Sequence, residues 1–580
     1  MRNKKLIVLF LIISVFMQIY SNVMAQNTVN GKVVDVAGEP LIGVNVIEKG
    51  TTNGTVTNVD GEFTINADRG STLVFSYIGF TTSEVVVTGN VLNVQLTEDA
   101  ELLEEVIVVG YGTQSKRNVS GAISSVRSDD IVRSTSTTLS GALAGKVQGI
   151  TTRATDARPG RGINLQVRNM GDPLYVIDGI AYGGMTGSDA FGFSQGSGEN
   201  IFNNLSLEDI ESISILKDAS AAVYGLRASN GVVLVTTKKG SRSEDVRINI
   251  NGYYGVQNFT RYPQPANAHQ FVRARVESEQ NYGRDPMSLY SPEELAKWQA
   301  GTEDGYKSYD YLDIVTRRNV PQYYINANVS GGTKRSTYYL SVAHTDQDAM
   351  LRDFYYKRSN VQANLEANLI TGLTVGSQMS AYLEKTHNVG VPGLDDYFNP
   401  LLSVFTMWPI ESPYANDNPK YIHQTHNVNV NPATYKDDVT GWIDQYNRSM
   451  NVNLYAEYKF NFGLGIKGTY SYNYRNDDFD GFEYTYNAYR YDKATDTYYT
   501  QPGWGNQNPW REKHKRNVVQ RFQQIQATYN KVFGDHDVSA VLAYEQSDYD
   551  NSYLVIHTVP SNNYIEKMYL NEQDWTCKLN

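Results

Sequence analysis

The sequence LEEVIVVGYGTQ, residues 103–114, separates two parts of the chain that differ in composition. Four apolar residues with high strand propensity, 106–109, follow two acids and end at a Gly-Tyr-Gly sequence that would interrupt a longer strand. Such a segment can pair edge to edge with a sheet of another protein, because its backbone supplies the hydrogen bonds. The alternative is that it forms the last strand of the preceding domain, since short apolar runs are ambiguous.

Residues 26–97 contain short runs of strand-forming residues with turn signals between them, and they predict a β-sandwich of about 70 residues. Asp60 and Gly61 predict a tight hairpin. The runs GEPLIGV (38–44) and NVDGEF (58–63) resemble the carboxypeptidase regulatory-like domain, which implies a non-catalytic module. Asn58 and Asp60 offer oxygen atoms to a calcium ion, but turn chemistry explains them better because the loop lacks further spaced oxygen ligands.

Residues 1–25 have the pattern of a signal peptide. Arg2, Lys4 and Lys5 precede an apolar run over residues 6–17, and small residues up to Ala25 offer a cleavage site. The run is shorter than the roughly 20 apolar residues of a membrane-spanning helix. We therefore expect an exported protein whose membrane contact, if it has one, is made by strands.

Residues 115–240 predict a compact α/β domain. Apolar spacing over residues 139–147, with a glycine shortly after, predicts a helix. A capping-box pattern at Ser206 predicts a helical turn, and Asp218 is placed to cap a second short helix over residues 219–224. Strands are expected at residues 173–179 (with a turn), 213–216 and 231–237.

Residues 241–580 predict part of a transmembrane β-barrel. All six tryptophans and most of the 43 tyrosines lie in this region, as expected for aromatic girdles at the two membrane surfaces. Alternation of apolar and polar residues is clear near residues 323, 361, 450 and 464. With further runs near residues 246, 336, 374, 518 and 538, the pattern predicts about nine strands. Plugged barrels use about 22 strands, so we expect an incomplete barrel.

Several motifs in one order carry a family resemblance. They are VSGAI at 119–123, GALAGKVQG at 141–149, PLYVIDG at 173–179, and KDASAAVYG at 217–225 followed by ASNG at 228–231. Together they resemble the plug of a SusC/RagA-like TonB-dependent outer-membrane transporter, with the chain matching the N-terminal portion of such a protein. A departure lies at residues 168–172, RNMGD, where the family usually continues with Arg-Gly and a longer loop.

The resemblance implies roles for the segment at 98–114 and partners for the protein. Residues 98–114 would be the linker that carries the TonB box, and residues 115–240 would be the plug. The energy for transport would come from TonB with ExbB and ExbD. A SusD-like lipoprotein would cover the barrel in the outer membrane, with oligosaccharides as the first expected cargo and peptides as the second. The residues similar to the TonB box are Glu104, Glu105, Val106, Ile107, Val108 and Val109.

Composition excludes several other classes of protein. A net charge of -11 argues against nucleic-acid binding. The single cysteine, Cys577, excludes an internal disulfide and cysteine-rich metal sites. All eight histidines lie beyond residue 268, so the first two domains offer no Ser-His-Asp centre. We expect no catalysis, no metal and no cofactor.

Two groups of residues are weak site candidates. His423 and His426 lie three apart in a loop without a third ligand, so they are better explained as loop residues than as a zinc site. Aromatic residues beyond 485 could stack on sugar rings, but packing at the membrane surface explains them better. These candidates are Tyr486, Tyr489, Tyr491, Tyr498, Trp504 and Trp510.

Two alternatives remain for function. A siderophore or vitamin receptor is the alternative within transport, although the N-terminal sandwich argues against it. The other alternative is a non-transporting fragment of a disrupted transporter gene, or a binding module that carries only the plug.

Overall fold

The computed structural model describes residues 28–36, 38–77, 80–97, 106–109, 112–115, 122–153, 158–160, 163–182, 198–390, 400–426, 431–507, 509–534, 536–565 and 576–579. The chain divides into two compact units, Met1–Ile107 with Thr113–Ser120, and Val108–Gly112 with Gly121–Asn580. The predicted signal peptide lies outside the described residues. Within the described residues, no helix is both long and apolar enough to cross a membrane.

The first unit contains the predicted β-sandwich, built from two small sheets with strand orders β4-β1-β7 and β3-β2-β5-β6. Alternate residues of β4 and β5 are buried, as expected when one face of each sheet packs against the other. Phe63 and Phe75 meet in the core with ring centroids 5.3 Å apart. The strands are β1 (Thr28–Val34), β2 (Asn45–Glu48), β3 (Gly54–Val56), β4 (Glu62–Asn66), β5 (Thr72–Ser76), β6 (Ser83–Val86) and β7 (Val94–Gln95).

The prediction of a hairpin at Asp60 and Gly61 is wrong. A turn forms there, but the flanking strands β3 and β4 belong to different sheets, so the turn joins the two layers of the sandwich. The Asn58 side-chain oxygen accepts hydrogen bonds from the backbone N–H groups of Asp60 (3.0 Å) and Glu62 (2.8 Å). This is the turn chemistry expected of Asn58.

Gly31→Ala is expected to destabilise the sandwich strongly. An added Cβ would lie 1.8 Å from the Leu92 carbonyl oxygen and 2.6 Å from the Phe63 ring. The backbone at Leu92 and the Phe63 side chain would both have to shift to make room for the added methyl group. We therefore expect a loss of about 3 kcal/mol in the free energy of unfolding. Hydrogen exchange of the β1 amides in the whole chain measures it. Gly89→Ala is the matched control, since no described atom lies within 4 Å of its added Cβ; equal effects would contradict the packing argument.

The second unit begins with a mixed five-stranded sheet in the order β10-β15-β16-β13-β14. Pairing is antiparallel except between β13 and β16, which run parallel. Its elements are β10 (Ile123–Arg127), α2 (Ser128–Val132), α3 (Leu139–Leu143), β11 (Ile150–Arg153), β12 (Asn164–Val167), β13 (Leu174–Ile177), β14 (Ile180–Tyr182), α4 (Gly198–Asn203), η2 (Leu207–Asp209), β15 (Ile210–Leu216), η3 (Ala219–Tyr224), η4 (Leu226–Ala228) and β16 (Val232–Thr237).

Both faces of this sheet are covered, which explains why its central strands are apolar throughout. All four residues of β13 are buried. On one face, Tyr175 and Ile177 join a core with residues of α2, α3 and α4. On the other face, Leu174 and Val176 pack with residues of η3 and η4. This domain, residues 122–240, is called the plug below.

Details of the short helices differ from the prediction. Helix α3 ends at Leu143 instead of continuing to 147, because Ala144 leaves helical geometry with ψ 124. Ser206 does not cap η2 with its side chain; its hydroxyl lies 2.9 Å from the Tyr324 hydroxyl. Asp218 does cap η3, accepting a hydrogen bond from the backbone N–H of Ser220.

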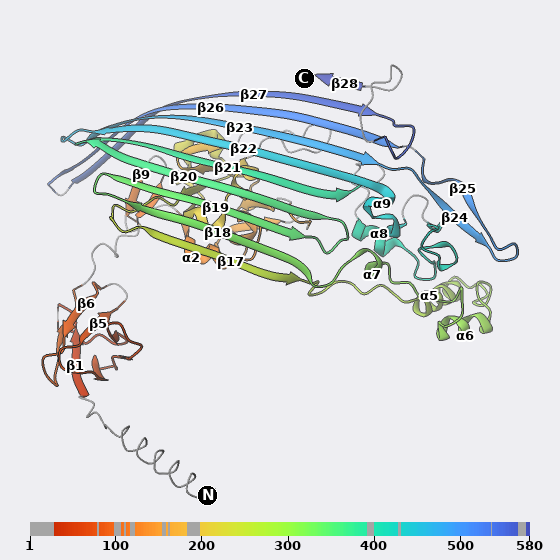
Figure 1. Ribbon diagram of the computed structural model, residues 1–580, viewed down its shortest axis with the longest axis horizontal. Helices are drawn as coiled ribbons and strands as arrows, with labels where there is room; N and C mark the ends of the chain where they lie inside the picture. Colours follow the sequence, from red (N-terminus) through yellow and green to blue (C-terminus); the bar gives the residue numbers. More distant parts are fainter. Residues whose placement is uncertain are drawn as a thin grey trace, which may run out of the picture. The chain divides into compact units, whose positions relative to one another are not determined.

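The remainder of the second unit is a large antiparallel sheet, shown in green to blue in Figure 1. The prediction of about nine strands is confirmed, and a short tenth strand, β28 (Thr576–Leu579), pairs with the last of them. The nine are β17 (Arg247–Gln257), β18 (Val320–Gly332), β19 (Ser336–Asp348), β20 (Tyr355–Ile370), β21 (Leu373–Val389), β22 (Gly441–Lys459), β23 (Leu464–Glu483), β26 (Trp510–Phe533) and β27 (His536–Thr558).

The two ends of this sheet carry connections of very different length. At one end, turns of two to four residues join β18 to β19, β20 to β21, β22 to β23 and β26 to β27. At the other end, the β19–β20 connection is short, whereas the other connections are long and carry the described helices of this region and a separate hairpin (Figure 1). Outer-membrane barrels combine short turns with longer loops at the outer surface in this way. The long connections contain α5 (Ala268–Asn281), α6 (Pro292–Ala300), α7 (Tyr311–Val315), α8 (Pro400–Thr406), η5 (Ala415–Asp417), η6 (Pro432–Thr434), α9 (Asp437–Thr440), β24 (Tyr486–Asp492) and β25 (Thr497–Asn506).

Candidate functional site

The predicted TonB-box residues lie partly in the described chain. Glu104 and Glu105 fall outside the described residues. Val106–Val109 form strand β8, which makes a two-stranded sheet with β9 (Gly112–Ser115). The segment is extended, as edge-to-edge pairing requires. Its role in contacting TonB remains a prediction.

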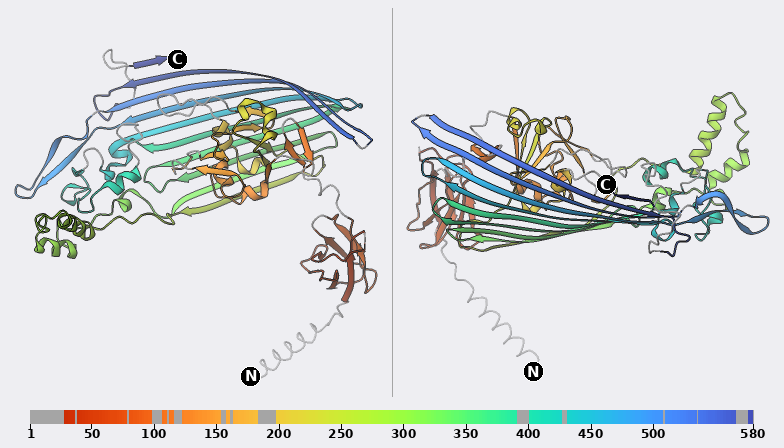
Figure 2. Two further views of the ribbon diagram at one scale, coloured as in Figure 1. Left: turned by 180° about the vertical axis from the view of Figure 1, so that it is seen from behind. Right: turned by 90° about the horizontal axis from the view of Figure 1, so that it is seen from above.

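The plug lies against one face of the large sheet, and Figure 2 shows this from two further sides. The side chains of the sheet alternate between its two faces. In β18, Gln322, Asn326 and Asn328 are buried, whereas Tyr323 and Ile325 point outward and are exposed. The inner face is therefore polar and meets the plug, and the outer face is apolar, as the alternation predicts for a barrel.

Arg358 of β20 joins the plug to the sheet. Its side chain is 2% exposed. The guanidinium donates to the backbone carbonyls of Asn203 and Thr137, both at 3.1 Å, and to the Asn204 side-chain oxygen at 3.2 Å. Asn360 orients it, because its side-chain oxygen accepts from Nε at 3.0 Å. One buried cation thus holds two separate segments of the plug.

A second contact involves Asp209 at the end of η2. The Tyr339 hydroxyl of β19 donates to its carboxylate at 2.8 Å. Burial raises the pKa of Asp209, although the hydrogen bonds from Ser341 and Tyr339 act in the opposite direction. Two tyrosines, Tyr339 and Tyr324, therefore fix the turn that leads into β15.

A third contact begins at Asp178, within the PLYVIDG motif. Asp178 has a positive φ of 49° and accepts from the Thr237 backbone N–H (2.9 Å) and hydroxyl (2.7 Å). Burial raises the pKa of this carboxyl group. The Asn364 amide of β20 in turn donates to the Thr237 hydroxyl (2.9 Å) and to the Lys238 carbonyl (2.7 Å). The motif therefore stabilises the end of β16 where it meets the sheet.

Glu199 of α4 gives the plug a pH-dependent group. Burial, together with the charge of Asp172, raises the pKa of Glu199 from 4.5 to about 7. The folded state binds the proton of the Glu199 carboxyl group more tightly than the unfolded chain does. Protonated Glu199 therefore contributes its full stabilisation below the pKa of the unfolded chain, and this stabilisation is lost as the pH rises to about 7.

Glu199→Gln is therefore expected to reduce the pH dependence of plug stability. The temperature of half-unfolding of the unmodified chain should decrease when the pH is raised from about 5 to about 7.5. The same change in pH should lower the temperature of half-unfolding of the variant by a smaller amount. Thermal melts at both pH values measure the difference. An equal fall in both proteins would contradict the assignment.

The aromatic candidates occupy different environments. Trp510 packs against Phe479, with centroids 6.0 Å apart, and Tyr486 is mostly covered. Tyr489 and Tyr498 pack on Tyr421 at 5.1 and 3.9 Å. Tyr491 lines a cavity. The side chain of Trp504 lies outside the described part of the chain. No group of three or more His, Cys, Asp or Glu side chains that could hold a metal ion occurs among the described residues.

The contacts between plug and sheet were not predicted from the sequence. Arg358, Tyr339 and Asn364 occupy inward-facing positions of their strands. An arginine at an inward-facing position is a sequence signal that could have been used. Their plug partners lie more than 120 positions away in sequence, so strand patterns could not identify them.

Comparison with known proteins agrees with this architecture. Residues 29–108 match the CarboxypepD_reg-like domain, and residues 115–232 match the TonB-dependent Receptor Plug Domain. The TonB-dependent receptor SusC of Bacteroides thetaiotaomicron is 32% identical over 370 residues, which are 62% of this chain and 34% of SusC. The TonB-dependent receptor P3 of Formosa agariphila is 27% identical over 500 residues, 83% of this chain and 44% of P3.

Solved structures show the same fold. The RagAB peptide importer in its open-open state superposes with a TM-score of 0.63 at 20% identity, covering 82% of this chain and 53% of the importer chain. The chain thus carries a CarboxypepD_reg-like domain followed by the plug domain of TonB-dependent receptors. More particularly, the chain is a homologue of SusC, as its motifs predict. It spans less than half the length of the curated relatives it matches.

Proposed function

We propose that a complete receptor containing this chain imports oligosaccharides across the outer membrane, with peptides as the second candidate cargo. The observation that carries the proposal is a plug held by buried polar contacts against the inner face of a barrel-type sheet. An import route through such a receptor opens when the plug is displaced, and polar contacts can exchange with water as this happens.

The energy for displacement comes, in this proposal, from TonB with ExbB and ExbD, acting on residues 104–109. An extended segment ahead of the plug can join a sheet of TonB by backbone pairing. A SusD-like lipoprotein covers the long connections and delivers solute to them. The protein is exported by its signal peptide and acts as a transporter, not an enzyme.

Uptake assays test this proposal directly. Cells that express a complete receptor containing this sequence should take up labelled oligosaccharides, and removal of TonB should reduce uptake to background. Deleting the gene for the neighbouring SusD-like lipoprotein should lower uptake at low solute concentration. Uptake of an iron–siderophore complex instead would favour the siderophore alternative, and uptake that does not depend on TonB would exclude the mechanism.

A further inference from the structure

A cavity of about 460 Å³ lies among the long connections, away from the contacts between plug and sheet. Its walls come from the β21–β22 connection and from the β24–β25 hairpin. Backbone hydrogen bonds fix these two segments together, from the Gln424 N–H to the Tyr489 carbonyl (3.0 Å) and from the Tyr489 N–H to the Ile422 carbonyl (2.7 Å). The cavity is therefore part of an ordered structure, and its volume is within the usual range for small-molecule sites.

One wall of the cavity consists of side chains that are already hydrogen-bonded to each other. The Glu411 carboxylate accepts from the His426 backbone N–H at 2.9 Å and bonds to Nδ1 of the same histidine. The His426 ring stacks on Trp408 with centroids 4.0 Å apart, and the Arg275 guanidinium lies 5.4 Å from the Trp408 ring centroid. These contacts use both side chains and hold this wall in place.

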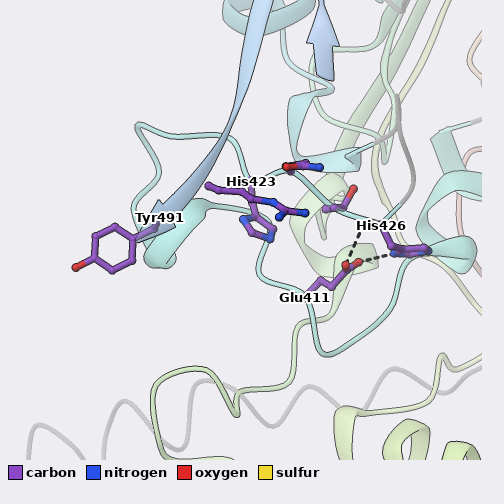
Figure 3. A pocket seen from close by; sticks show the side chains of 7 residues that line it. Glu411, His423, His426 and Tyr491 are labelled. Atoms are coloured by element: carbon purple, nitrogen blue, oxygen red, sulfur yellow. Dashed lines mark hydrogen bonds and ion pairs between the residues drawn. The ribbon is translucent and has the colours of Figure 1, made fainter. Parts of the chain in front are cut away.

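The opposite wall contains polar groups that lack partners. Among the described residues, Arg490 forms no ion pair, and its side chain is exposed. Nδ1 of His423 and the side-chain oxygen of Gln424 are buried without a hydrogen-bond partner, and Gln424 is only 6% exposed. Because buried polar atoms are normally paired, such groups at a cavity indicate a ligand that supplies the missing partners. Figure 3 shows His423 between Tyr491 and the pair of Glu411 and His426.

We propose that this cavity binds a carboxylate group of the transported solute. Arg490 and His423 donate hydrogen bonds to the carboxylate, and the Gln424 side-chain oxygen accepts a hydrogen bond from a neighbouring group of the solute. This inference rests on the proposed import function. The planar fork of a guanidinium matches a carboxylate with two parallel hydrogen bonds. A carboxylate fits better than a phosphate, because its single negative charge balances the charge of Arg490. A phosphate dianion would bring a second negative charge close to Glu411.

The state of His423 supports this arrangement. Burial and the charge of Arg490 lower the pKa of His423, which favours the neutral form of the ring. A neutral imidazole still donates one N–H to an anion. Tyr491 stands beside this wall, with its hydroxyl 2.8 Å from Asp496 and its ring 4.9 Å from Tyr498, so an aromatic surface adjoins the charged group.

Two sources of carboxylate fit this chemistry, an acidic sugar and a peptide C-terminus. Binding to the full chain purified in detergent, measured by calorimetry, separates them with four probes: trigalacturonate, maltotriose, trialanine and trialanine amide. Preference for trigalacturonate over maltotriose assigns an acidic oligosaccharide. Preference for trialanine over its amide assigns a peptide carboxylate.

Arg490→Gln is expected to weaken binding of the preferred acidic probe roughly 10- to 100-fold, because a charge-assisted hydrogen-bond pair is lost. The affinity of Arg490→Lys should lie between those of the unmodified protein and Arg490→Gln, since lysine keeps the positive charge but cannot form the two parallel hydrogen bonds of a guanidinium. Lys493→Gln is the matched control: it removes the same charge from the turn of the same hairpin, away from the cavity lining, and should leave affinity unchanged.

Three results would overturn the proposal: equal affinity for acidic and neutral probes, an equal loss in Lys493→Gln, or no binding of any probe. The proposed function fails separately. Import of neutral maltotriose that depends on TonB, together with equal affinities, would remove the carboxylate site and leave the transporter. Binding of the acidic probe with the expected Arg490 dependence, but without TonB-dependent uptake, would keep the site and remove the transporter.

Discussion

Val108→Pro is expected to abolish solute uptake by a complete receptor that contains this sequence, while solute binding to the purified protein stays unchanged. Val108 lies in the middle of strand β8. Proline removes the backbone N–H donor at this position and fixes φ near the value for polyproline, so it interrupts a ladder of backbone hydrogen bonds. Because β8 pairs with β9 in a two-stranded sheet separate from those of the plug and the barrel strands, the contacts of those domains should persist.

Two measurements check this expectation. Uptake of labelled oligosaccharide by cells expressing Val108→Pro should equal that of cells without TonB, and calorimetry should give the same affinity as the unmodified protein. Val108→Thr is the control, since threonine keeps both the N–H group and strand propensity; it should retain most uptake. Normal uptake by the proline variant would exclude residues 104–109 as the TonB contact.

Arg358→Met is expected to loosen the plug from the sheet. Methionine fills much of the same volume but leaves two plug carbonyls, of Asn203 and Thr137, without their donor. The side-chain oxygens of Asn204 and Asn360 also lose a partner. Each buried acceptor left unpaired costs about 1 to 3 kcal/mol, so the total loss should be about 3 to 5 kcal/mol after rearrangement and entry of water.

Limited proteolysis of the plug in detergent-purified protein measures this loss as faster cleavage between residues 122 and 240. Lys357→Met is the matched control. Lys357 is the preceding residue on the same strand and faces the other side, where it forms a partly exposed ion pair with Asp346 at 3.0 Å. Exposed pairs contribute at most about 1 kcal/mol. Similar cleavage rates for the two variants would contradict the role given to Arg358.

The sequence predicted those features that follow from local patterns. Alternation near residues 323 and 450 correctly placed the polar face and the apolar face of the strands, because side chains in a strand point to opposite sides by geometry. The cap at Asp218 was also predictable, since it involves residues two positions apart. In each case the information lies within a few residues.

Long-range choices were not predictable in the same way. Ser206 has the pattern of a capping residue, yet its hydroxyl is paired with Tyr324, 118 positions away. The turn at Asp60 and Gly61 looks like a hairpin because the local signal does not say which sheet each flanking strand joins. The partners of Arg358 likewise depend on how the plug docks, which no local pattern encodes.

The polar character of the surface between plug and sheet has a mechanical consequence. Asn364, Asn360 and Arg358 hold the plug through discrete hydrogen bonds to carbonyl oxygens and, for Asn364, to a hydroxyl oxygen as well. Under traction, water can replace these bonds one after another, so shear at this boundary requires far less work than pulling apart a hydrocarbon interior. The apolar layers on the two faces of the β13–β16 sheet lie within the plug, except that Phe522 of β26 joins one of them from the large sheet. A pulling force should therefore break the boundary first and leave the plug as a movable folded body.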